Sequence, residues 1–230
     1  MVKEHFNSIA ERYDLVNRLI SLNLDRCWRR KACEEALKVL SPSEDKISVL
    51  DVACGTGDML RCLRKKLAEK GIDAEFYGLD CSENMLEVAK KKVPFARLVH
   101  GFAEDMPFRD ESFDLITVAF GVRNFSDREK AIGELYRVLK PSGVLAVLEF
   151  SRNPSFLGKT AWFYTKSVVP LIGGLVTGDE EAYAYLVRSI RRFPRPKELS
   201  KEFERAGFST LRLRWFFPRI AFLLLLRKGR

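Results

Sequence analysis

Histidine, glutamine and long apolar runs are scarce or absent in this sequence of 230 residues. Only His5 and His100 could offer an imidazole to a metal ion, so we expect no metal site. The longest apolar run, residues 220–226, is far too short to cross a bilayer, and the polar, charged first residues do not form a signal peptide. Glutamine is absent while lysine, arginine and glutamate abound, a composition typical of thermophilic sources.

The cysteines do not form the pattern of a disulfide framework. Five is an odd number, and no pair has zinc-finger spacing. Cys54, Cys62 and Cys81 all fall near expected strand ends or helices. Because disulfides persist in oxidising compartments, this usage favours a reducing cytosol, and we expect a cytoplasmic protein.

The size and charge of the chain narrow the class of protein. A length of 230 residues fits one α/β domain with a large core. The net charge of +9 and the pI near 9.4 suit an anionic partner, either nucleic acid or the surface of an anionic membrane. The same excess is also typical of solvated helix faces such as residues 61–66 and 90–92.

Residues 49–58 read as a buried strand that enters a glycine turn and opens a helix. Gly55 and Gly57 let the backbone approach a ligand closely, and the helix start presents unpaired N–H groups. A dinucleotide fingerprint would carry a third glycine where Leu60 stands. Its absence favours a ligand that ends in an amino acid, such as S-adenosylmethionine, over NAD or FAD. The two glycines alone are equally typical of a plain strand-to-helix connection.

Asp80 strengthens the nucleotide interpretation. It closes a second expected strand, residues 75–80, where a carboxylate can accept hydrogen bonds from both hydroxyls of an adenosine ribose. The alternative is a helix N-cap, a role for which Ser82 competes.

Alternating strand and helix patterns predict a Rossmann-like α/β fold with a seven-stranded, mostly parallel sheet. Only a turn at Pro218, with no helix, separates the last two strands, which predicts an antiparallel hairpin at one sheet edge. The expected strands are 47–53, 75–80, 96–100, 113–120, 143–150, 209–216 and 220–227, and the expected helices are 58–70, 83–92, 127–139 and 197–206.

We predict a single domain, residues 1–230, in which two segments stand outside this alternation. Residues 47–150 form the cofactor-binding core and residues 196–230 a C-terminal helix and hairpin. Residues 1–40 form an N-terminal helical cap, and residues 154–193 form an insertion rich in aromatics and glycine. Because ligands of open α/β sheets lie beyond the carboxyl ends of the strands, we expect both segments to act as lids, the insertion facing the substrate. The cap shows helical spacing at Phe6, Ile9, Tyr13, Val16 and Ile20.

The combined pattern resembles class I S-adenosylmethionine-dependent methyltransferases, and more closely the ubiquinone and menaquinone C-methyltransferase family. The resemblance covers most of the chain. It rests on residues 6–14, 119–124, 136–141, 147–151 and 169–174, with Asp179, Tyr183, Tyr185, Leu186 and Ser189. The C-terminus departs from the family, because it lacks a glycine-containing strand with a histidine, and this leaves the methyl acceptor open.

The residues and the resemblance together give a set of candidate site positions. The resemblance implies S-adenosylmethionine as the cofactor, with Phe102 and Ala103 beside the adenine. The candidate cofactor contacts are Asp51, Gly55, Thr56, Gly57, Asp80, Met85, Phe102, Ala103 and Ala119, and the candidate catalytic residues are Arg123, Asn124 and Tyr13.

Family membership would imply methylation of a quinol ring carbon, in demethylmenaquinol or a polyprenyl benzoquinol. Arg123 stays protonated, so we expect it to anchor an oxyanion rather than to act as a base. The alternatives are an ion pair of Arg123 with Asp127, a turn role for Asn124 and a core role for Tyr13.

The partner expected for this function is a small lipophilic aromatic substrate. If the opening of the substrate site faces the membrane, the enzyme lies at the inner face of the membrane. The alternative is that the same residues form an ordinary lid core with a solvated basic edge. The material for such an opening is Phe156, Trp162, Phe163, Tyr164 and the arginines of residues 188–195.

Three other functions compete with quinol methylation. Another small-molecule methyltransferase, acting on oxygen or nitrogen, and a non-catalytic S-adenosylmethionine-binding protein both stay open. Nucleic-acid amino-methylation would place an Asn/Asp-Pro-Pro-aromatic motif after the fourth strand, but the nearest string, residues 153–156, follows the fifth. We therefore expect no nucleic-acid partner, and a homodimer stays open.

Overall fold

The computed structural model describes residues 18, 21–41, 46–170 and 180–229. Seven strands form one sheet in the order β3-β2-β1-β4-β5-β7-β6. Strands β1 to β5 are parallel, and β7 lies antiparallel between β5 and the edge strand β6. The predicted mostly parallel sheet with an antiparallel C-terminal hairpin is confirmed. The strands are β1 (Lys46–Val52), β2 (Asp73–Asp80), β3 (Ala96–His100), β4 (Phe113–Ala119), β5 (Leu139–Phe150), β6 (Phe208–Phe216) and β7 (Ala221–Lys228).

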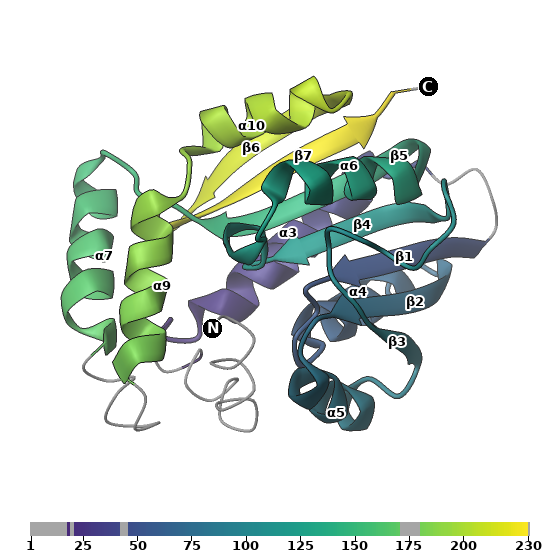
Figure 1. The fold of residues 1–230 in the computed structure, drawn as a ribbon, viewed down its shortest axis with the longest axis horizontal. Helices are drawn as coiled ribbons and strands as arrows, with labels where there is room; N and C mark the ends of the chain where they lie inside the picture. The colour runs from purple at the N-terminus through teal and green to yellow at the C-terminus, as the bar shows by residue number, and fades with distance from the viewer. Residues whose placement is uncertain (1–17, 19–20, 42–45, 171–179, 230) are drawn as a thin grey trace.

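Helices cover both faces of the sheet (Figure 1). One face packs against α3 (Leu24–Val39), α4 (Asp58–Ala68) and α5 (Glu83–Lys92). The other face packs against α6 (Arg128–Val138) and α10 (Pro196–Arg205). Successive strand residues point to opposite faces, so Val49 joins one apolar core and Leu50 the other.

Local capping explains two helix starts and separates alternatives that the sequence left open. The Ser82 hydroxyl accepts a hydrogen bond from the Met85 N–H at the start of α5, so Ser82, and not Asp80, is the N-cap. The Asp127 carboxylate accepts from the Lys130 N–H at the start of α6. Asp127 therefore acts as a helix cap.

Strand β5 begins four residues before its predicted start at residue 143. Leu139 pairs with Phe113, whereas Val144 pairs with Leu115, so the chain bulges between these two pairs. Pro141 and Gly143 normally end regular structure, but a bulge tolerates both residues inside a strand.

Helix α3 is the described part of the expected N-terminal cap. Its buried side chains Trp28, Ala32 and Ala36 belong to the core on one face of the sheet. This part of the cap is therefore a structural helix and not only a lid. The helical spacing noted at Phe6, Ile9, Tyr13, Val16 and Ile20 lies outside the described residues.

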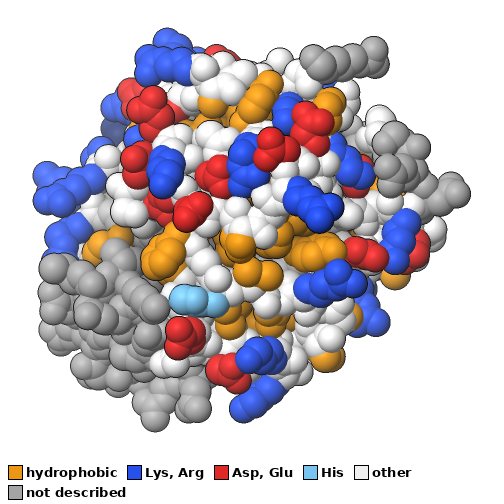
Figure 2. Space-filling view, turned by 45° about the vertical axis from the view of Figure 1, so that its right-hand side comes forward, with side chains coloured by type: hydrophobic (Ala, Val, Ile, Leu, Met, Phe, Trp, Pro, Cys, Tyr) orange, Lys and Arg blue, Asp and Glu red, His pale blue; other side chains and the backbone are white. Residues whose placement is uncertain are grey.

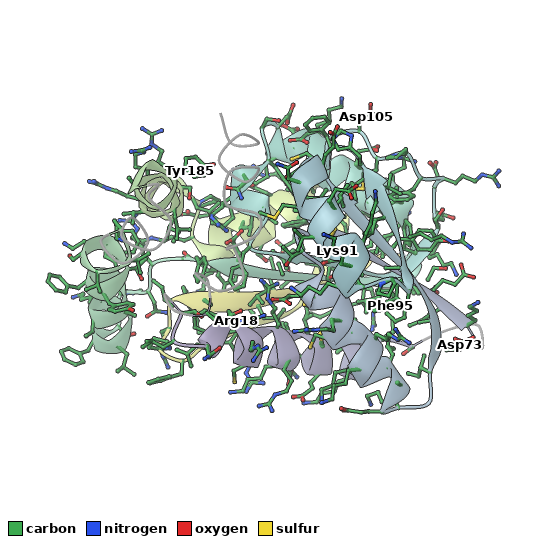
Figure 3. All side chains as sticks on the ribbon, turned by 90° about the horizontal axis from the view of Figure 1, so that it is seen from below. Arg18, Asp73, Lys91, Phe95, Asp105 and Tyr185 are labelled. Carbon is green, nitrogen blue, oxygen red and sulfur yellow. The ribbon has the colours of Figure 1, made fainter. Side chains whose placement is uncertain are left out.

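Two further helices, α7 (Phe156–Ser167) and α9 (Glu180–Arg192), stand side by side at one end of the molecule. The parallel strands run toward this end. Figure 3 shows Asp73, at the start of β2, at the end opposite to Tyr185 on α9. In the part of the chain that the structure describes, no helix is long and apolar enough to span a bilayer.

The surface carries charges of both signs. On the face drawn in Figure 2, lysine and arginine side chains are largely interspersed with aspartate and glutamate. This distribution is expected of solvated helix faces. On this face, the excess of basic residues is therefore better explained by solvation than by an anionic partner.

Candidate active site

A pocket opens at the carboxyl ends of the parallel strands. The loops after β1, β2, β3 and β4 all contribute to it. Strand β1 lies between β2 and β4, so the chain order reverses at this point, and such a switch point leaves a crevice for a ligand. The lining residues are Ala53, Gly55, Leu79, Asp80, Cys81, Met85, Gly101, Phe102, Ala103, Glu104, Ala119, Phe120, Gly121, Asn124, Phe125 and Ser126.

The two glycines of the turn after β1 have different roles. Gly55 has φ +54°, and a Cβ placed on it would meet no atom within 4 Å, so the space beside it is open to a ligand. Gly57 has φ +84°, and a Cβ there would lie 2.7 Å from a methyl group of Val93. Gly57 and Thr56 do not line the pocket, and the Thr56 hydroxyl accepts a hydrogen bond of 3.0 Å from Lys92.

Asp80 ends β2 and turns its carboxylate to the pocket. One oxygen accepts from the Gly55 N–H at 2.8 Å and the other from the Ser82 N–H at 2.9 Å. Burial raises the pKa of Asp80, while these two N–H bonds oppose the rise. An ionised carboxylate offers about four lone-pair sites, so acceptors remain for the two hydroxyls of a ribose.

Asp51 lies behind the glycine turn and does not line the pocket. Its side chain is buried and accepts a hydrogen bond of 2.6 Å from the Thr117 hydroxyl. Burial raises the pKa of Asp51 to about 7. Among the candidate cofactor contacts, Asp51, Thr56 and Gly57 thus form the second layer of the site.

The side of the pocket expected to hold the adenine is apolar. Phe102 and Ala103, the two residues that the resemblance places beside the adenine, line the pocket together with Met85 and Ala119, and the Phe102 side chain is half-exposed. An aromatic ring with an open face can stack on a planar base.

The sequence did not reveal how closely the loops approach one another. A Cβ on Gly121 would lie 2.6 Å from the Cβ of Ala53, so the loops after β1 and β4 meet only because residue 121 is glycine. Glu104 accepts hydrogen bonds from the Ser126 N–H and hydroxyl, which ties the loop after β3 to the loop after β4. Gly121 lies in the Phe-Gly-Val-Arg-Asn motif, which is the signal that could have identified it.

Arg123 lies in the short helix η1 (Val122–Asn124) and forms a buried ion pair. Its Nη1 donates to Glu149 Oε1 at 2.7 Å and to the Phe120 carbonyl at 2.5 Å. The Glu149 side chain is fully buried and that of Arg123 is 6% exposed. The interpretation of Arg123 as the partner of Asp127 is therefore wrong, because β5 places a carboxylate beside it.

Arg123 lies next to the pocket and not on its lining, whereas Asn124 lines it. The Arg123 Nε is buried with no hydrogen-bond partner among the described residues. Asn124 Oδ1 accepts a hydrogen bond of 3.1 Å from the Tyr185 hydroxyl, which brings α9 to the pocket. The third candidate catalytic residue, Tyr13, lies outside the described residues.

In the described part of the chain, the cysteines form no disulfide and the possible metal ligands form no cluster. None of the five cysteines, all of which lie among the described residues, forms a disulfide. Across residues 21–41, 46–170 and 180–229, no three histidine, cysteine, aspartate or glutamate side chains gather closely enough to hold a metal ion.

The sheet order, the glycine turn and the ribose-type carboxylate define a class I methyltransferase fold. Solved structures share this fold: a methyltransferase from Thermotoga maritima superposes with a TM-score of 0.64 at 22% identity, over 100% of both chains. A second, from Methanococcus maripaludis, has a TM-score of 0.64 at 19% identity, over 96% of this chain and 92% of its own.

A family model described as the ubiE/COQ5 methyltransferase family matches residues 1–220, and the chain belongs to that family. It is therefore an S-adenosylmethionine-dependent methyltransferase, as the resemblance implied. The demethylmenaquinone methyltransferase of Thermotoga maritima is 43% identical over 88% of this chain and 86% of its own. The corresponding Thermus thermophilus enzyme is 44% identical, over 89% and 91%. A ubiquinone/menaquinone biosynthesis C-methyltransferase of Campylobacter jejuni is 36% identical, over 98% and 96%.

Proposed function

We propose that this enzyme methylates a ring carbon of a quinol precursor with a lipophilic tail, of the demethylmenaquinol class. The observation that carries the proposal is the buried Arg123 guanidinium beside the pocket, next to Asn124 on its wall. A fixed cation at this place suits an acceptor that becomes a phenolate. The names of the relatives at 43% and 44% identity support the same substrate class.

The residues of the pocket fit S-adenosylmethionine. The open space at Gly55 admits a close ligand, and Asp80 offers acceptors to the ribose hydroxyls. Met85, Phe102 and Ala103 offer an apolar surface to the adenine. When bound, S-adenosylmethionine supplies a methyl group on a sulfonium, and the sulfur keeps the bonding electron pair when the ring carbon takes the methyl.

Arg123 would act on the oxygen of the acceptor and not as a base. Its guanidinium stays protonated, so the phenol proton must leave to water or another base. The resulting oxyanion pushes electron density onto the neighbouring ring carbon, and the ring later loses its hydrogen as a proton. A guanidinium has five N–H donors, so its bonds to Glu149 and Phe120 leave donors for the oxyanion.

Asn124 would position the ring. The Tyr185 hydroxyl already occupies its Oδ1, so the amide NH₂ is the group left to donate to an acceptor oxygen. Two donors from neighbouring residues of η1 would hold the quinol so that one ring carbon faces the methyl group.

The proposal is tested by calorimetric titration with S-adenosylmethionine and by methyl transfer to a short-tailed demethylmenaquinol under reducing conditions. Asp80→Asn should weaken cofactor binding by about 10- to 100-fold, because charge-assisted bonds to the ribose are lost. The matched control is Asp105→Asn, which makes the same change on an exposed residue of the loop after β3 and should bind as the wild type does.

Arg123→Lys and Asn124→Ala should lower turnover of the quinol by more than about 100-fold while the cofactor affinity changes less than threefold. Wild-type enzyme that binds the cofactor but makes no methylated quinol would contradict the proposal. So would an Arg123→Lys enzyme with full turnover.

A further inference from the structure

The outward face of α7 carries large aromatic side chains between basic ones, whereas a solvated helix face would carry mainly polar side chains. Phe156 is 82% exposed and Phe163 is 61% exposed, although both are large apolar residues. The exposed residues of this helix follow helical spacing on one side, and we call them the α7 face. The α7 face consists of Phe156, Leu157, Lys159, Thr160, Phe163, Lys166 and Ser167.

The opposite side of α7 packs against the rest of the protein. Ala161 and Trp162 pack against the core of the sheet, and Gly158 is buried against the backbone of Asn153. Trp162 therefore belongs to the inner side of the helix, in contrast to its expected place at a membrane-facing opening. The exposed phenylalanines are not required by the fold.

The charge of this segment is of one sign. Residues 151–170 contain three basic residues and no acidic residue, so nothing in this stretch repels an anionic surface. Lys166 Nζ lies 5.4 Å from the centre of the Phe163 ring. Phenylalanine and lysine alternate along the α7 face, which places an apolar ring beside each ammonium group. Such pairs suit a lipid interface, where the ring enters the headgroup region and the lysine stays in water.

The neighbouring helix adds charge at the same end of the molecule. Arg188, Arg191 and Arg192 on α9 are exposed. The Arg152 guanidinium, at the start of the α7 segment, donates a hydrogen bond of 3.1 Å to the Arg191 carbonyl and so links the two helices. Figures 1 and 3 both show α7 and α9 at the end toward which the parallel strands run, where the pocket opens.

We propose that the α7 face docks on the surface of an anionic phospholipid bilayer, with Phe156 and Phe163 inserted among the headgroups and Lys159 and Lys166 at the phosphates. Charge complementarity and the position at the pocket end of the sheet favour this occupant over a second protein. The inference rests on the proposed function in one respect: a quinol with a long apolar tail resides in the membrane, so docking here would bring the pocket to its substrate.

The test is sedimentation of the whole enzyme with vesicles of phosphatidylcholine and phosphatidylglycerol, compared with phosphatidylcholine alone. Wild-type enzyme should bind the anionic vesicles more tightly. Lys159→Gln/Lys166→Gln should weaken this binding about thirtyfold, because each lysine near an anionic surface contributes about a factor of five. Phe156→Ser/Phe163→Ser should weaken it more than about tenfold.

Two control variants match these changes elsewhere on the surface. Lys65→Gln/Lys91→Gln removes the same charge from exposed positions of α4 and α5, and Leu211→Ser removes an exposed apolar side chain from β6. Both should bind vesicles within threefold of wild type. At about 1 M salt, where the Debye length is about 3 Å, the difference between the lysine variant and the wild type should disappear.

Turnover separates this inference from the proposed function. The α7-face variants should methylate a water-soluble, short-tailed quinol at the wild-type rate and a long-tailed quinol in vesicles at least tenfold more slowly. Absence of quinol turnover in every variant, with vesicle binding as predicted, would overturn the proposed function and leave the docking surface standing. Wild-type enzyme that ignores anionic vesicles, or α7-face variants that bind like wild type, would overturn the docking surface. A wild-type dimer that the phenylalanine variant converts to monomer would assign the face to a second copy and also overturn it.

Discussion

Replacing Glu149 by alanine would leave the Arg123 guanidinium buried without its counter-charge. The pair is almost fully enclosed, with a distance of 2.7 Å between Nη1 and Oε1. Removing one partner of a buried ion pair costs about 3–5 kcal/mol, because the remaining charge has lost both water and its partner. That cost is a large fraction of the 5–15 kcal/mol, roughly, that stabilises an ordinary domain.

A double-mutant cycle separates this effect from simple loss of packing. We expect the free energy of unfolding to fall by about 3–5 kcal/mol in Glu149→Ala. Arg123→Met alone should cost about as much, because it leaves the Glu149 carboxylate buried and unpaired. In Arg123→Met/Glu149→Ala, where no charge stays buried, the loss should be clearly smaller than the sum of the two single losses. Glu69→Ala is the control, because it breaks an exposed pair with Lys66 and should cost less than about 1 kcal/mol.

Urea unfolding followed by tryptophan fluorescence measures these differences. The ring of Trp28 lies 6.3 Å from that of Phe120 and 6.0 Å from that of Phe150, so its emission reports on the packing around the pair. A cost below about 1 kcal/mol for Glu149→Ala would refute the reasoning, since exposed pairs have such values. Strict additivity in the cycle would refute it as well.

Further predictions concern residues that line the pocket or lie directly behind its wall. The pKa of Asp51, about 7, lies above its unfolded value, so the folded state binds more protons between about pH 4 and 7 and loses stability as the pH rises. Asp51→Asn removes this loss, so between pH 5 and pH 8 the free energy of unfolding of the variant, measured in urea, should rise by about 3 kcal/mol relative to that of the wild type. A difference between variant and wild type that stays constant with pH would show that Asp51 does not titrate in this range. Gly57→Ala should lower the free energy of unfolding by about 3 kcal/mol or more, because of the clash with Val93 and the positive φ. Gly55→Ala should lower it by only about 1–2 kcal/mol and should chiefly weaken cofactor binding in calorimetry. Equal effects of the two variants on stability and on cofactor affinity would be inconsistent with their different surroundings. Tyr185→Phe should raise the KM for the quinol, or lower turnover, by about 3- to 10-fold and leave cofactor affinity unchanged, because the bond to Asn124 is lost; a change in cofactor affinity instead would exclude that role.

Most of the fold could be predicted because central strands such as β4 and β7 are buried along most of their length and because the helices have clear ends. Ser82 and Asp127 are typical N-caps, and both cap helices in the structure. The start of β5 could not be predicted in the same way. Pro141 and Gly143 indicate the end of regular structure, and only the pairing of Leu139 with Phe113 carries the strand through them.

The site was predictable where a residue touches the ligand space directly, and less so behind it. Asp80 and Asn124 follow strand ends, so their positions on the pocket follow from sheet topology. The ion pair of Arg123 could not be predicted in this way, because its partner Glu149 is 26 residues away in the chain and is brought beside it by the neighbouring strand. Sequence spacing pointed to Asp127, which is near in the chain but serves α6.

Locating the transferred methyl group tests the central claim most directly. Wild-type enzyme is incubated with S-adenosylmethionine carrying a deuterated methyl group and with a demethylated naphthoquinol, and the product is analysed by mass spectrometry and NMR. We predict that the label is bonded to a ring carbon of the quinol and that Arg123→Lys removes this product while the cofactor still binds. A label on a quinol oxygen, or cofactor binding without any labelled quinol, would contradict the assignment of this pocket to quinol C-methylation.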